Sequence, residues 1–183
     1  MKIAIDIDDT LTNTKDNQIK LWKEYYNKQP KVGFSEQLPS DINEFDADEY
    51  IGIFWNTYRK QLSFNSTYKK DASTIIDKLK NDGHELCIVT SRPDDRYENL
   101  TERIATALKE NDIHIDTIHT NARDKGSYCK EHNFDLLIDD NIKQIQSAKN
   151  NGLKGILFNE IKDYEGLQTN NWKDLYNIIK ELQ

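Results

Sequence analysis

Three aspartates follow an apolar run at the start of the chain. The first residues read MKIAIDIDDT and place Asp6, Asp8 and Asp9 at the end of a short strand-like segment. Like charges at this density disfavour one another unless a cation or hydrogen-bond donors offset them. A carboxylate can attack a phosphorus atom, and a second carboxyl two residues on can exchange a proton with the leaving group. The alternative is a solvated strand end whose acids cap a helix.

Polar side chains also follow two later apolar runs. Thr90 and Ser91 come at the end of CIVTS, and Asp139 and Asp140 end the run FDLLIDD. Lys125 lies in RDKGSYCK, near the expected start of a helix that precedes the second of these runs. In open parallel sheets, ligands bind beyond the carboxyl ends of the strands. We therefore expect these residues to converge at one edge.

The converging residue types suit a metal ion and a phosphoryl group. Carboxylates from two strand ends, such as Asp6 and Asp139, repel each other unless a cation lies between them. Hard oxygen ligands with few other donors favour Mg²⁺, which also takes phosphate oxygens. Thr90, Ser91 and Lys125 supply two hydroxyls and a positive charge, which suit the phosphoryl group. The adjacent Asp140 is either a further ligand or a supporting residue, because successive side chains of a strand point apart.

Strand-like and helix-like runs alternate through most of the chain. The runs expected to form strands are 2–7, 84–90, 115–120, 134–139 and 154–159. The helical patterns cover 71–83, 96–112, 141–152 and 172–183. Short and nearly continuous apolar runs are typical of strands that are covered on both faces. The pattern predicts an α/β fold with a doubly wound parallel sheet.

Residues 14–68 break this alternation. The segment has helical stretches and many aromatic residues but no convincing strand, so we expect a small helical cap inserted after the first strand. Residues 1–13 and 69–183 would then form the catalytic core. Aromatic residues of such a segment are more often core than binding surface, but a flat apolar slot is also how a nucleobase is held. The candidates for stacking on a base are Trp22, Phe34, Trp55 and Tyr58.

Composition narrows the classes of ligand and location. The chain has 183 residues and a formal net charge of −7, which argues against a nucleic-acid polymer as partner. Two cysteines do not make a disulfide framework. The apolar run at residues 3–7 is too short for a signal peptide or a membrane span. We expect a cytoplasmic protein with a small-molecule ligand, and association into a homodimer is left open.

Four short motifs carry a resemblance to a known family. The four motifs of the haloacid dehalogenase-like (HAD) superfamily resemble four stretches of this chain: DIDDTLT, the strand end TSRP, the lysine of RDK and the run DLLIDDN. Members of this superfamily are mostly Mg²⁺-dependent phosphatases. Within it, the last three are most similar to those of the 5′(3′)-deoxyribonucleotidases. Asp9 and Thr10 follow the general superfamily pattern, whereas deoxyribonucleotidases often have Gly and an aliphatic residue there.

The resemblance implies a role for each motif residue. Asp6 would be the nucleophile and Asp8 the general acid and base. Asp6 and Asp139 would ligate Mg²⁺ through their side chains, and Asp8 through its carbonyl. The phosphate-binding residues would be Thr90, Ser91 and Lys125.

These observations lead to one main expectation and two alternatives. The main one is a Mg²⁺-dependent phosphomonoesterase acting through an aspartyl-phosphate on a nucleoside monophosphate, preferably a deoxynucleotide. The first alternative is a phosphatase of sugar phosphates or other small phosphomonoesters. The second is a non-catalytic module that binds phosphate and metal. Arg92 and Arg123 flank the motifs and are further candidates for phosphate binding.

Overall fold

The chain divides into two compact units in a computed structural model that describes residues 1–28 and 54–182. The core unit comprises Met1–Thr12 and Tyr68–Gln183, and the helical unit comprises Asn13–Thr67. Each unit is described by itself.

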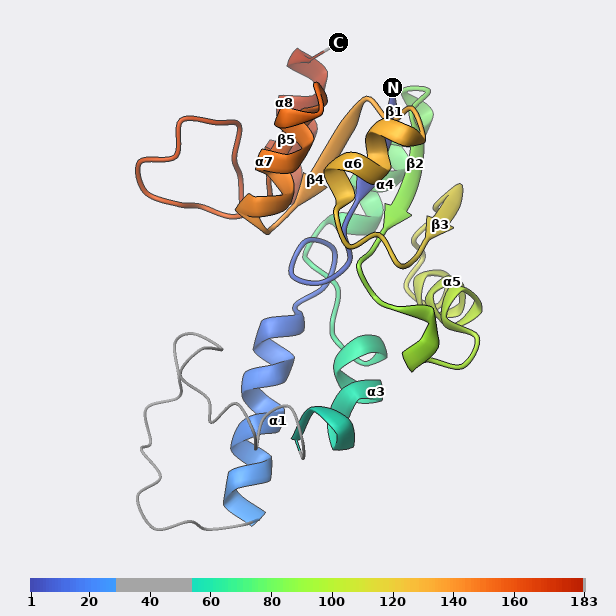
Figure 1. Cartoon of the computed structure of the whole chain (residues 1–183), viewed down its shortest axis with the longest axis vertical. Coiled ribbons are helices and arrows are strands. Elements are labelled where there is room, and N and C mark those ends of the chain that lie inside the picture. Colours follow the sequence, from blue (N-terminus) through green and yellow to red (C-terminus); the bar gives the residue numbers. More distant parts are fainter. Residues whose placement is uncertain (29–53, 183) are drawn as a thin grey trace. The chain divides into compact units, whose positions relative to one another are not determined.

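A five-stranded parallel sheet forms the centre of the core unit (Figure 1). Its strands are β1 (Lys2–Ile5), β2 (Glu85–Val89), β3 (Thr117–His119), β4 (Leu136–Asp139) and β5 (Lys154–Leu157). They lie in the order β3-β2-β1-β4-β5. The predicted doubly wound parallel α/β fold is confirmed. Each expected strand is present, and each is shorter than the apolar run that predicted it.

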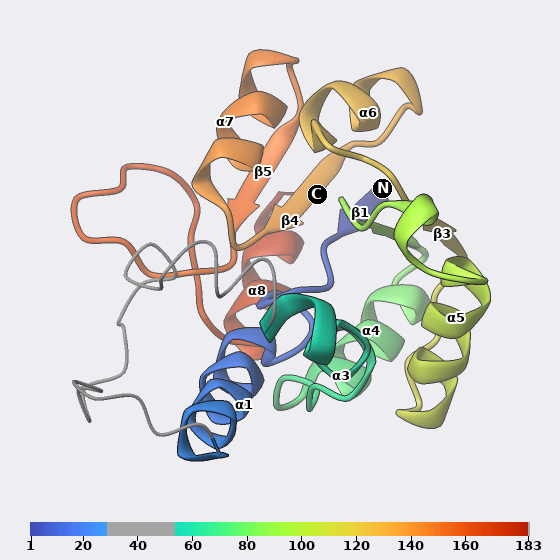
Figure 2. The same cartoon turned by 60° about the horizontal axis from the view of Figure 1, so that its bottom comes forward.

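Helices cover both faces of this sheet. They are α4 (Ala72–Asn81), α5 (Leu100–Glu110), α6 (Lys125–Glu131), α7 (Ile142–Asn150) and α8 (Trp172–Glu181). Figure 2 shows α6 and α7 on one side of the sheet and α4, α5 and α8 on the other. Among the described residues, no helix combines the length and the apolar character needed to cross a membrane.

Burial on both faces explains why the strands are apolar throughout. Ile3, Ala4 and Ile5 of β1 are all fully buried, although successive side chains of a strand point to opposite faces. Cys87 and Cys129 are free and buried in the same core. Their place in the core accounts for them without a redox role.

The described part of the helical unit contains α1 (Thr14–Lys28) and α3 (Asn56–Phe64). Its apolar core consists of Leu21, Trp22, Tyr25, Phe54 and Leu62. The rings of Trp22 and Phe54 meet edge to face with centroids 4.7 Å apart, so Trp22 belongs to the interior of this unit. Trp55 and Tyr58 pack against it and stay partly exposed. Phe34 lies outside the described residues.

A glycine allows α6 to approach α7 closely. A Cβ atom added to Gly126 would lie 2.3 Å from the backbone carbon of Ser147 and 2.4 Å from the backbone nitrogen of Ala148. Backbone atoms in the middle of a helix cannot yield by a change of rotamer, so α6 itself would have to move. Because Lys125 begins this helix, Gly126 also sets the position of a candidate site residue.

We expect Gly126→Ala to lower the free energy of unfolding by about 3 kcal/mol, because overpacking against a helix backbone forces the backbone to shift. The matched control is Gly152→Ala, where a Cβ meets nothing within 4 Å and the cost comes from a φ of +79°, about 1 kcal/mol. Urea denaturation of both variants measures the difference. Equal losses of stability would contradict the close approach.

Candidate active site

Two carboxylates meet at the carboxyl edge of the sheet, between β1 and β4. β1 lies between β2 and β4, and the helices α4 and α7 of the core unit, which come after β1 and β4, cover opposite faces of the sheet. Doubly wound folds bind ligands where the connections diverge in this way. The backbone N–H of Asp6 donates to the carbonyl of Ile138 at 3.0 Å, so Asp6 lies next to Asp139. Both side chains are almost fully buried. The sequence prediction that strands one and four bring these acids together agrees with this placement.

The ammonium group of Lys125 lies between the two carboxylates. It forms ion pairs with Asp6 and, at 2.6 Å, with Asp139. Burial alone would lower the pKa of Lys125, but attraction to Asp6 and Asp139 outweighs it and raises that pKa above its usual value. Lys125 is held in place by its backbone N–H, which donates to Gln144 Oε1 at 2.9 Å. The ammonium therefore stays charged and fixed.

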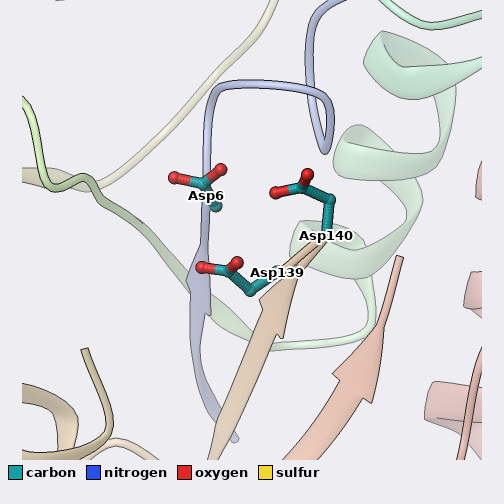
Figure 3. Close-up of side chains that lie close together, drawn as sticks. All are labelled: Asp6, Asp139 and Asp140. Atoms are coloured by element: carbon teal, nitrogen blue, oxygen red, sulfur yellow. The ribbon is translucent and has the colours of Figure 1, made fainter. Parts of the chain in front are cut away.

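Asp140 completes a cluster of three acids, shown in Figure 3. One carboxylate oxygen from each of Asp6, Asp139 and Asp140 lies within 4.8 Å of the others. Burial, then repulsion by Asp139 and Asp9, raises the pKa of Asp140 to about 7. Burial is also the largest cause of the raised pKa of Asp6. It outweighs the attraction of Lys125, which lowers that pKa, and repulsion by Asp139 adds to the rise. The single ammonium does not offset all of this negative charge.

This donor set fits a magnesium ion. All three groups offer carboxylate oxygens, the ligand type that Mg²⁺ prefers, and they come from the ends of two neighbouring strands. A divalent cation there would also relieve the repulsion that raises the pKa of Asp6 and Asp140. The structure brings the side chain of Asp140 into the cluster, which the sequence left open.

The loop after β1 is a tight turn fixed by its backbone. The carbonyl of Ile7 accepts hydrogen bonds from the N–H groups of Leu11 and Thr12, both at 3.0 Å. Asp9 adopts a φ of +58°, a left-handed conformation that aspartate tolerates better than most residues. Trp172 donates its indole N–H to the carbonyl of Thr10 at 3.3 Å. The loop that carries the first motif is therefore anchored to α8.

The loop after β2 carries the two expected phosphate-binding hydroxyls. Thr90 is buried, and its backbone N–H and carbonyl pair with His119 and Ala122. Ser91 is exposed and donates its hydroxyl to the carbonyl of Ala122 at 2.9 Å. The Ser91 hydroxyl would have to turn to donate to a phosphate oxygen. Phosphate binding by Thr90, Ser91 and Lys125 stays a prediction.

An ion pair between Asp8 and Arg92 was not foreseen from the sequence. Nε of Arg92 donates to Oδ2 of Asp8 at 3.0 Å, and Nη2 donates to Oδ1 at 2.7 Å. Arg92 is 8% exposed, although arginine is seldom buried without a partner. Its place beside Ser91 indicated a role near the site, but only the fold pairs it with a residue 84 positions away.

Comparisons with known proteins bear on the fold. No protein-family model and no curated protein sequence matches the chain. Among solved structures, a protein from Thermotoga maritima assigned as a β-phosphoglucomutase matches with a TM-score of 0.69 and 15% identity, covering 100% of both chains. A predicted phosphatase from Clostridium acetobutylicum matches at 0.67 and 16%, covering 98% of each chain.

A third structure is YfnB from Bacillus subtilis, assigned as a HAD hydrolase and bound to magnesium. It matches with a TM-score of 0.67 and 15% identity, again covering 98% of each chain. Identities this low speak for the fold rather than for the chemistry. The chain has the fold of the HAD-superfamily hydrolases.

Proposed function

We propose that this protein is a Mg²⁺-dependent phosphomonoesterase that acts through an aspartyl-phosphate. The observation that carries the proposal is the buried arrangement of Lys125 between Asp6 and Asp139 at the carboxyl edge of the sheet. A buried carboxylate beside a fixed ammonium is suited to attack a phosphoryl group, because the ammonium stabilises the charge of the transferring oxygens. Solved structures with the same fold include a predicted phosphatase, which supports this class of reaction.

The reaction would proceed in two halves. In the first, an oxygen of Asp6 forms a bond to phosphorus while the bond to the ester oxygen breaks, and Asp8 gives the departing oxygen a proton. In the second, the oxygen of a water molecule forms a bond to phosphorus while the bond between phosphorus and the Asp6 oxygen breaks, and the water gives a proton to Asp8. Inorganic phosphate leaves, and Asp6 and Asp8 return to their starting states.

Asp6, Asp139 and Asp140 would hold the magnesium ion in this scheme. When bound, the ion supplies charge neutralisation for the phosphoryl oxygens. Lys125 bridges Asp6 and Asp139 and orients both carboxylates from the interior.

The proposed substrate is a nucleoside monophosphate, preferably a deoxynucleotide. The motifs TSRP, RDK and DLLIDDN support it through their similarity to those of the 5′(3′)-deoxyribonucleotidases. Trp55 and Tyr58 keep exposed surface in the helical unit and could stack on a base. One observation favours a sugar phosphate instead: Trp22, also a stacking candidate, is buried in the helical unit's own core.

We expect Asp6→Asn to abolish phosphatase activity, because an amide oxygen is a poor nucleophile and forms no stable acyl-phosphate. Denaturing wild-type protein during turnover of a ³²P-labelled substrate should trap an acid-stable, alkali-labile phosphoprotein that is absent from Asp6→Asn. The matched control is Asp163→Asn, an exposed aspartate, which should retain full activity. Full activity of Asp6→Asn would refute the mechanism.

A panel of phosphomonoesters distinguishes the substrate classes. Under the main proposal, kcat/KM for deoxynucleoside monophosphates should exceed that for hexose phosphates by at least about tenfold, since one well-made contact to the base is worth about 1.4 kcal/mol. Preference for hexose phosphates would select the second candidate. No turnover of any ester by a folded, metal-binding protein would indicate a binding module.

Magnesium should stabilise the wild-type protein against heat, because a ligand that binds only the folded state adds about 2.7 kcal/mol at a hundredfold excess over its Kd. EDTA should reverse the shift in melting temperature and abolish activity. We expect Asp139→Asn to reduce the shift strongly and Asp163→Asn to leave it unchanged. A magnesium shift that is the same in Asp139→Asn would contradict the proposed metal site.

A further inference from the structure

Arg92 is a buried cation that the mechanism above does not use. Two of its nitrogens donate to the two oxygens of Asp8, at 3.0 and 2.7 Å, so the pair is bidentate. Parallel hydrogen bonds of this kind fix the plane of a carboxylate as well as its distance. The Asp8 side chain is 38% exposed, so these two hydrogen bonds orient a side chain that solvent and substrate can reach.

The backbone of Arg92 is held on both sides. Its N–H donates to Oγ1 of Thr90 at 3.3 Å, and its carbonyl accepts a hydrogen bond from the N–H of Asn121 at 3.0 Å. The side chain of Asn121 also donates to Asp94, in the short helix that follows. The loop after β2 therefore presents the guanidinium from a fixed position.

We propose that Arg92 is a positioning residue that orients Asp8 for proton transfer. The inference rests on the proposed function, in which Asp8 gives a proton to the departing oxygen and later takes one from water. Arg92 itself neither gains nor loses a proton, because guanidinium does not deprotonate in proteins. Lysine would keep the charge but could not donate to both oxygens of Asp8 in a bidentate pair, so Arg92→Lys should not retain the kcat of the wild-type protein.

A direct contact between Arg92 and the phosphoryl group is the competing role. If Arg92 made this contact, its substitution would weaken substrate binding whatever residue stands at position 8. A residue that acts through Asp8 instead loses its effect when Asp8 is replaced. A double-mutant cycle separates the two roles, since it measures whether the effects of Arg92 and Asp8 are independent.

The experiment compares kcat and KM of the wild-type protein, Arg92→Gln, Asp8→Asn and the double variant, with the best ester from the panel and saturating Mg²⁺. We expect Asp8→Asn to lower kcat by about 10²- to 10⁴-fold and Arg92→Gln to lower it by about 10²-fold, the cost of a misplaced catalytic group. In the Asp8→Asn background, Arg92→Gln should change kcat further by no more than about twofold, which is the precision of such a cycle.

Three controls keep these outcomes distinct. Arg96→Gln replaces an exposed arginine of the short helix that follows this loop and should leave kcat and KM unchanged. Melting temperatures test folding, and Arg92→Lys repeats the cycle if glutamine proves too destabilising. An equal loss in both backgrounds, or a raised KM with unchanged kcat, would overturn the inference. An inactive wild-type protein would overturn the proposed function and, with it, this role of Arg92.

Discussion

The buried ammonium of Lys125 is the interaction on which the arrangement of the site depends. Asp6 and Asp139 end neighbouring strands and are both nearly excluded from water, so two ionised carboxylates would repel strongly at low dielectric. Lys125 supplies the compensating charge from a helix on one face of the sheet. Removing it would leave the acids unpaired, which ties the stability of the core to the chemistry proposed for its edge.

The position of Lys125 in turn depends on how α6 packs. Gly126 allows close contact with α7, and Gln144 of α7 accepts the backbone N–H of Lys125. The N-cap residue Asp124 accepts hydrogen bonds from Ser127 and from Ser147 of α7. Helix capping and a single glycine therefore determine where the ammonium group of Lys125 lies. Substitutions of Gly126, Gln144 or Asp124 should therefore affect the site, although none of these three residues has a catalytic role in the proposed reaction.

The pair of Arg92 and Asp8 has a different character from the Lys125 cluster. Lys125 joins acids that come directly from the sheet, whereas Arg92 and Asp8 both belong to loops beyond it. The Asp8 loop is held by its own turn and by Trp172, and the Arg92 loop by the segment around Asn121. Two independently anchored loops meet in one bidentate contact, which suits a group that must stay oriented while it exchanges a proton.

The alternation of strands and helices could be predicted from the amino-acid sequence, because burial on both faces makes each strand an apolar run with polar residues at its end. The sequence also predicted that Asp6 and Asp139 lie at one edge, since parallel strands share a carboxyl side, and that Lys125 lies near the start of the helix before β4. Three features became known only from the folded chain: Asp140 joins the acids, Trp22 is core, and Arg92 pairs with Asp8. Those outcomes depend on rotamers and loop paths, which are fixed by contacts between residues far apart in the chain rather than by local pattern.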